Sequence, residues 1–227
     1  MWLALFNKEF REIAPIGAVA LFFHLMVVSG LVGIEAFQRL PILSWTGFIP
    51  RGGQGIPFLG DQYSTPFILI SCVFIAILAV RQSAWETLRG THPFLLHRPM
   101  ARSSIFLVKI LTGLLVFFIC SVIPILIYGC WASIPGTHPS PFEWSMTDWF
   151  FRTLFAAPIL YLGYYMVSLR PARWWGTRLF PLVVAITLFI GVHWIPLWWP
   201  FGLIAVLVIS ALMVFSTLHL AQERDFS

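Results

Sequence analysis

The chain has 227 residues, of which 59% are hydrophobic, 17% are aromatic and only 10% are charged. Soluble proteins carry roughly 25% charged residues, so a water-soluble domain of this size could not cover so much apolar surface. The net charge of +5 does not indicate nucleic-acid binding, because the basic residues lie at the ends of apolar runs and orient a membrane protein there. We expect one all-α integral membrane domain over residues 1–227, since spans of ~20 residues leave no room for a second domain.

The first residues predict a short helix that lies in the membrane interface. Over residues 1–13, large apolar side chains recur at helical spacing on one face and charged side chains lie on the other, a pattern typical of interfacial helices. A frayed polar terminus is the alternative. Pro15 then suits the first turn of a new helix, because proline is tolerated there. The apolar face consists of Trp2, Phe6, Phe10 and Ile13.

Apolar runs predict six transmembrane spans after this helix. A basic island at residues 81–103 separates the second run from the third and is expected on the cytoplasmic side. With the N-terminus inside, 11 of the 14 basic residues are cytoplasmic, and only Arg39, Arg51 and Arg152 are outside. Both termini are therefore predicted to be cytoplasmic. The predicted spans are 15–34, 63–80, 104–131, 148–169, 179–195 and 198–218.

The fourth predicted span contains a charged residue one turn from its start. Arg152 can extend toward the outer surface, and Asp148, four residues earlier on the same helix face, is its expected partner. A charge that lines a substrate path is the alternative for Arg152.

The basic island permits two interpretations from its residues alone. Its apolar side chains, Trp85 and Phe94–Leu96, could enter a groove on a partner as a short helix, with charged residues forming a polar rim. Contact with lipid headgroups alone is the other interpretation. The membrane itself is a partner in both cases.

The island also carries an ordered pattern: Glu86, then Gly90-Thr91, Leu95-Leu96, Arg98-Pro99, Arg102 and Lys109. This pattern resembles the first cytoplasmic loop of ABC-2-type transporter permeases, and residues 7–11 are similar to the elbow helix that begins those proteins. The resemblance implies an ABC-2 (type V exporter-like) architecture with an interfacial elbow helix and six spans. It also implies a loop that docks on an ATPase through Glu86, Arg89, Gly90, Thr91, Arg98 and Arg102.

The resemblance further implies a function and a set of partners. The chain would be the permease subunit of an ABC exporter in the bacterial plasma (inner) membrane. Two copies of a separate ATPase subunit would bind ATP and Mg²⁺, and a second permease chain would form a homo- or heterodimer with this one. A lipid, a hydrophobic peptide or a drug-like molecule would suit an apolar path between the chains.

Four residues are candidates for that path: His24 and Ser29 on the first span, and Thr187 and His193 on the fifth. An ionisable residue in mid-membrane is a functional candidate by default. For His24, a neutral imidazole hydrogen-bonded to a neighbouring helix is the alternative. For His193, which lies among tryptophans, the alternatives are a haem-handling protein without ATP coupling and an ordinary aromatic belt.

No motif predicts an enzyme. The chain has no phosphate-binding loop of the form Gly-x-x-x-x-Gly-Lys-Ser/Thr, no His-Glu-x-x-His and no Gly-x-Ser-x-Gly. Its three cysteines form no Cys-x-x-Cys pair, so neither a disulfide framework nor a zinc site is indicated. We expect no catalytic site, no metal site and no cofactor in this chain; an intramembrane enzyme is the remaining alternative.

Overall fold

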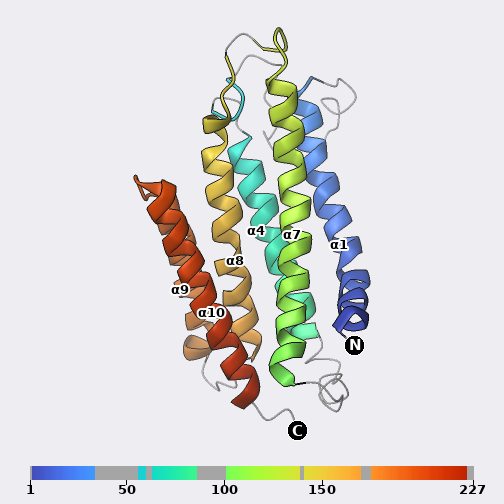
Figure 1. Cartoon of the computed structure of the whole chain (residues 1–227), viewed down its shortest axis with the longest axis vertical. Coiled ribbons are helices and arrows are strands. Elements are labelled where there is room, and N and C mark those ends of the chain that lie inside the picture. Colours follow the sequence, from blue (N-terminus) through green and yellow to red (C-terminus); the bar gives the residue numbers. More distant parts are fainter. Residues whose placement is uncertain are drawn as a thin grey trace.

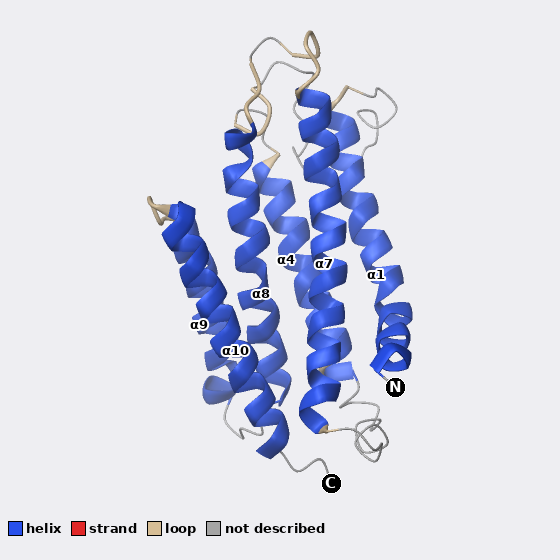
Figure 2. Cartoon of the chain, in the orientation of Figure 1, coloured by secondary structure: helices blue, strands red, loops and turns tan. Residues whose placement is uncertain are grey.

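In the computed structural model, residues 2–33, 56–59, 63–85, 101–138, 141–169 and 175–223 are described. Within these ranges the regular structure is entirely helical, and six helices are long and apolar enough to cross a membrane (Figure 2). The prediction of a multi-pass all-α membrane protein is confirmed at this level. The long helices are α1 (Trp2–Leu31), α4 (Ser64–Gln82), α7 (Arg102–Ala132), α8 (Asp148–Leu169), α9 (Trp175–His193) and α10 (Leu203–Glu223), with short helices η1 (Trp144–Thr147) and η2 (Trp198–Gly202) before α8 and α10.

The helices run side by side in one bundle (Figure 1). Helix α1 packs on α7 and α4, and α8 packs on α4, α9 and α10. Helix α1 therefore lies along one edge of the bundle, and α9 and α10 lie along the other. The start of α1, the end of α4, the start of α7 and the end of α10 all lie at the same end of the bundle, which we call the N-terminal face.

Helix α1 corrects one predicted boundary. The sequence predicted a break between an interfacial helix over 1–13 and a span that starts at Pro15, but residues 2–31 form one helix with Pro15 inside it. A proline removes one backbone hydrogen bond, yet membrane helices tolerate it where neighbouring helices pack closely. Gly17 provides such packing, since a Cβ there would lie 2.8 Å from Val116 Cγ1 of α7. The interfacial position of the first turns stays a prediction.

The bundle core is formed mainly around α8. Of its most hydrophobic segment, 67% is buried, against 22% for α9 and 17% for α10. Close packing of α8 on α9 depends on Gly163, because a Cβ there would lie 2.5 Å from the Ala185 Cβ, and small residues let membrane helices approach one another. Toward the end opposite the N-terminal face, the ring of Tyr63, the residue before α4, stacks on the ring of Phe150 with 4.9 Å between their centres. The centre of the Tyr128 ring lies 5.4 Å from that of Tyr63.

Candidate functional site: a buried polar cluster at the N-terminal face

Two oppositely charged side chains are buried together between α1 and α7. Glu9 is 1% exposed and Lys109 is fully buried, and the Glu9 Oε1 atom lies 3.3 Å from Lys109 Nζ. Burial of a charge is costly unless the charge is paired. The two residues therefore determine how α1 and α7 align at this depth.

Two neutral polar side chains extend this ion pair to α4 and α8. The Gln82 Nε2 atom donates a hydrogen bond to the backbone carbonyl of Lys109 at 3.0 Å, and the Tyr161 hydroxyl donates to Gln82 Oε1 at 2.7 Å. Both side chains are buried. Gly113 leaves the space for them, since a Cβ there would lie 2.8 Å from the Tyr161 hydroxyl oxygen and closer still to Gln82 Oε1. We call Glu9, Gln82, Lys109 and Tyr161 the polar cluster.

A more exposed group of charges lies beside the polar cluster. Glu12 pairs with Arg81 at 3.3 Å and with Lys8 at 3.4 Å, and Lys8 also reaches Glu9 at 3.5 Å. The Arg81 guanidinium lies 5.6 Å from the ring centre of Trp85, within the range of a cation–π contact. These contacts hold the end of α4 against the first turns of α1.

The polar cluster lies at the base of the loop that joins α4 to α7 (residues 83–101). Gln82 is the last residue of α4, and Lys109 lies two turns into α7. We call the end of α4 and the first two turns of α7 the stems of this loop. The Gln82–Lys109 hydrogen bond joins the two stems directly, while Glu9 and Tyr161 connect them to α1 and α8.

The sequence analysis did not predict Glu9, Gln82 or Tyr161 as site residues, and it gave Lys109 a different position. Lys109 was placed at the end of the loop pattern, whereas its side chain is buried against Glu9. The signal was present, because a lysine inside the apolar run of the third span requires a partner. Glu9 and Gln82 border their own apolar runs and were the available candidates.

Most of the predicted ATPase-coupling residues lie outside the described residues: Glu86, Arg89, Gly90, Thr91 and Arg98. Arg102 is described and is the exposed first residue of α7. Its position at a loop stem is compatible with the predicted role, which stays a prediction.

The four candidate path residues are not brought together within one chain. His24 and Ser29 belong to α1, and Thr187 and His193 belong to α9, at opposite edges of the bundle. Ser29 donates to the Leu25 carbonyl at 2.7 Å, and the exposed Thr187 donates to the Val183 carbonyl at 3.0 Å. Both hydroxyls therefore bond to their own helix.

His24 is fully buried, and its ring centre lies 5.1 Å from that of Phe67 of α4. The alternative interpretation required a hydrogen bond from His24 to a neighbouring helix. Among the described residues, neither His24 ring nitrogen has a hydrogen-bond partner, so this alternative finds no support. A buried imidazole without partners is unusual.

His193, by contrast, has a partner at each ring nitrogen. Nδ1 lies 2.9 Å from the Phe189 carbonyl and Nε2 lies 3.0 Å from the Thr153 hydroxyl. A carbonyl can only accept, so Nδ1 carries the proton of the neutral ring. The Thr153 hydroxyl has one proton, which it can donate either to Nε2 or to the Trp149 carbonyl at 3.1 Å. The centre of the Trp149 ring lies 4.7 Å from the centre of the His193 ring. Ligation of a haem iron would require one of these contacts to break, so the geometry does not favour the haem-handling alternative.

Arg152 joins α8 to the turn between α9 and α10. Its Nε atom lies 2.7 Å from Asp148 Oδ2, which confirms the predicted pair. Its Nη1 atom donates to the Ile195 carbonyl at 2.8 Å, and its guanidinium lies 5.5 Å from the ring centre of Trp198. These contacts assign Arg152 a structural role at the end of the bundle opposite the N-terminal face.

The fold and the polar cluster place this chain in the class of multi-pass helical membrane proteins, and the polar cluster connects four of its helices, α1, α4, α7 and α8. Within the described ranges, no three His, Cys, Asp or Glu side chains gather as a metal site would require. No family model matches the chain, and neither does any curated protein or any solved structure.

Proposed function

We propose that this chain is the permease subunit of an ATP-driven exporter in a bacterial plasma membrane. In this proposal a separate ATPase subunit, present in two copies, docks on the loop at residues 81–103 and binds ATP and Mg²⁺. A second permease chain completes the complex. The substrate is a lipid, a hydrophobic peptide or a drug-like molecule.

The polar cluster is the observation that carries the proposal. In a transporter of this kind, a conformational change of the ATPase displaces the coupling loop, and that displacement must move the transmembrane helices. This requires that the end of α4 and the start of α7 move together as one rigid unit. The Gln82–Lys109 hydrogen bond ties the two stems together. The Glu9–Lys109 ion pair and the Tyr161–Gln82 hydrogen bond extend that tie to α1 and α8. A displacement of the loop would therefore reach four helices at once.

The positions of the candidate path residues support a path between two chains. Because α1 and α9 form opposite edges of the bundle, His24 and His193 could line one path only if the α1 edge of one chain faces the α9 edge of another. The low burial of α9 and α10 leaves area for such an interface. An apolar path of this kind suits an apolar substrate.

Glu86→Ala and Arg98→Ala are expected to separate the chain from its ATPase. Each substitution removes one charged contact at the rim of the interface, which costs ~1 kcal/mol, about fivefold in affinity, and the two together cost ~2 kcal/mol, about 30-fold. The measurement is affinity purification of the tagged chain in mild detergent, with quantification of the co-purified ATPase and of transport in vesicles. Arg173→Ala, a basic residue of another predicted cytoplasmic loop, is the matched control and should retain the ATPase. A wild-type chain that purifies without any ATPase would refute the proposal.

The predicted orientation has its own test. In a background where Cys72, Cys120 and Cys130 are replaced by serine, a membrane-impermeant maleimide should label Gly136→Cys in intact cells. Gly90→Cys should be labelled only after permeabilisation, because the basic loop is predicted to be cytoplasmic. Gly136 is exposed, and apart from its two chain neighbours no described residue has an atom within 4 Å of the Cβ position, so the new thiol is accessible. The reverse labelling pattern would overturn the orientation.

A further inference from the structure

Three polar side chains are buried without a hydrogen-bond partner in α1, α4 and α7, helices that all pack on one another. His24 of α1 and Ser121 of α7 are fully buried, and Ser71 of α4 is 1% exposed. Within the described residues, neither His24 ring nitrogen and neither serine hydroxyl has a partner. Burial of a polar group without a hydrogen bond is costly, so groups of this kind indicate a bound polar molecule.

The two serines differ from Thr112, another fully buried hydroxyl residue of α7. The Thr112 hydroxyl donates to the backbone carbonyl of Val108 at 2.7 Å, four residues earlier in its own helix. Serine and threonine commonly satisfy a buried hydroxyl in this way. Because the hydroxyls of Ser71 and Ser121 make no such bond, both remain available to another molecule.

Helices α1, α4 and α7 meet at Gly17 of α1. A Cβ there would lie 2.8 Å from Val116 Cγ1 of α7 and 4.0 Å from Phe74 Cζ of α4. Gly17, Val116 and Phe74 therefore mark one level in the bundle and serve as reference residues for depth. From this level, α1 and α7 run away from the N-terminal face, whereas α4 runs toward it (Figure 1).

The three unpartnered side chains lie at neighbouring depths beyond this level. Ser71 precedes the reference residue of α4 by three residues, Ser121 follows that of α7 by five, and His24 follows that of α1 by seven. At 1.5 Å per residue, these steps place them about 4.5, 7.5 and 10.5 Å farther from the N-terminal face. The His24 side chain also leans back toward the serines, because helical side chains tilt toward the N-terminus of their helix.

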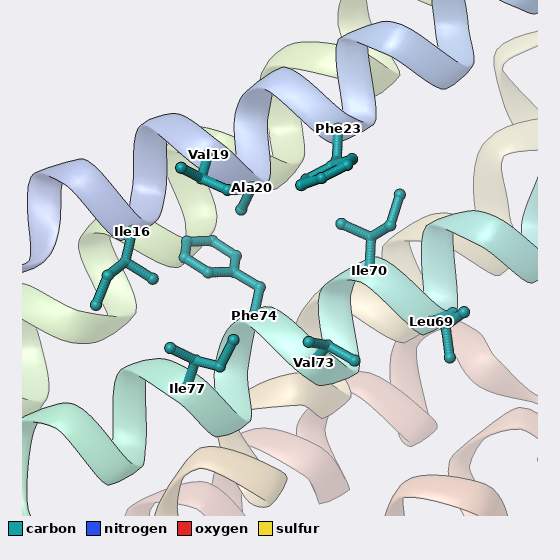
Figure 3. A pocket seen from close by; sticks show the side chains of 9 residues that line it. All are labelled: Ile16, Val19, Ala20, Phe23, Leu69, Ile70, Val73, Phe74 and Ile77. Carbon is teal, nitrogen blue, oxygen red and sulfur yellow. The ribbon is translucent and has the colours of Figure 1, made fainter. Parts of the chain in front are cut away.

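His24 and Ser71 face the inside of the bundle. On its outside, an apolar groove of about 220 Å³ follows the α1–α4 interface, and nine apolar side chains line it (Figure 3). Phe23 and Ile70, the sequence neighbours of His24 and Ser71, belong to this groove. Successive residues of a helix point about 100° apart, so the two buried polar side chains point away from the groove.

Pro124 adds a fourth polar group to this region of α7. It lies inside the helix, and because proline has no N–H, the carbonyl of Cys120 lacks its usual donor four residues later. Cys120 faces α1, since its sulfur lies 3.2 Å from the Cβ position at Gly17. The carbonyl is therefore an acceptor next to Ser121 and on the side of α7 toward α1.

We propose that ordered water is bound between α1, α4 and α7 and connects His24 to the hydroxyls of Ser71 and Ser121, with the Cys120 carbonyl as a further acceptor. The spread of about 6 Å in depth equals two successive hydrogen bonds of ~2.8 Å through one water molecule. Buried water typically bonds to about three otherwise unpaired groups. All four groups are neutral donors or acceptors when the imidazole is uncharged, so they suit water better than an ion. The site does not depend on the proposed transport function.

Water-edited NMR of the full chain in lipid bilayers, with ¹³C-labelled histidine, tests this site. The experiment measures the transfer of magnetisation from water to the histidine rings, and His24→Gln assigns the His24 signal by its loss. We expect transfer to the His24 ring, with the exposed His219 ring as the positive control. No transfer to His24 in a sample where His219 receives it would overturn the proposal.

The serines are tested by removal of their hydroxyls. Ser71→Ala combined with Ser121→Ala should reduce the transfer to His24 at least about fivefold, because each lost hydrogen bond weakens the binding of water by about that factor. Thr112→Val is the matched control, since it removes a buried hydroxyl that is bonded to its own helix, and it should leave the transfer unchanged. Circular dichroism checks the fold, and each single serine variant replaces the double variant if the latter does not fold. Undiminished transfer in a folded serine variant would overturn the proposal, as would an equal loss in Thr112→Val.

Discussion

Lys109→Met is expected to lower the free energy of unfolding by ~3 kcal/mol, because it leaves the Glu9 carboxylate buried without its main partner. Glu9 is 1% exposed and lies 3.3 Å from Lys109 Nζ. The remaining contact of Glu9, to Lys8 at 3.5 Å, is longer and comes from a more exposed side chain. Titration of the purified full chain with denaturing detergent, followed by circular dichroism, measures the loss.

Two further variants show whether burial is the cause. Glu9→Leu combined with Lys109→Met should recover most of the stability, since a buried ion pair can be replaced by apolar side chains of similar volume at little cost. Lys8→Met removes a lysine whose pair with Glu12 is partly exposed and should cost less than ~1 kcal/mol. If Lys109→Met costs no more than Lys8→Met, the ion pair does not hold α1 against α7.

Gly113→Ala is expected to be nearly as damaging, with a loss of ~2–3 kcal/mol from overpacking. The added methyl group would lie 2.8 Å from the Tyr161 hydroxyl oxygen and closer to Gln82 Oε1, so the hydrogen bond between these side chains could not persist. The same unfolding titration measures the loss. If the chain is a permease, the variant should also hydrolyse ATP with its partner but transport less, because α8 no longer follows the loop stems.

Gly191→Ala is the matched control for this substitution. Gly191 is also a helix-interior glycine, but apart from its chain neighbours and the adjacent turns of its own helix backbone, no described residue has an atom within 4 Å of its Cβ position. Its replacement should be neutral or stabilise the protein by up to ~1 kcal/mol. Tyr161→Phe removes the oxygen that the methyl group meets, so its effect and that of Gly113→Ala should be less than additive. Full additivity would mean that the methyl group and the hydroxyl do not meet.

The sequence predicted those contacts that lie within one helix. Asp148 and Arg152 are four residues apart, so any helix brings them together, and the structure has the pair at 2.7 Å. Contacts between helices were not predictable in this way. Glu9 and Lys109 meet only because α1 packs on α7 at a particular depth, and nothing in either apolar run specifies that neighbour.

The residues predicted to line the substrate path also show that the sequence did not specify which helices are neighbours. His24 and His193 were chosen because each is an ionisable residue in a predicted span, which is a property of the span alone. Their helices lie at opposite edges of the bundle, so a single chain cannot combine them. The coupling residues from Glu86 to Arg98 lie outside the described residues, and their role still rests on the resemblance of the loop pattern.

By itself, the sequence determined that the chain has six segments long and apolar enough to cross a membrane as helices, because transfer of a segment into lipid depends on the composition of that segment. It also indicated where the basic charge is concentrated. Only the tertiary structure decided that Glu9, Gln82, Lys109 and Tyr161 form one cluster, and that His24, Ser71 and Ser121 are buried at neighbouring depths. These features depend on which helices are neighbours and at what depth they meet, and the close packing of small and large side chains across four helices sets both.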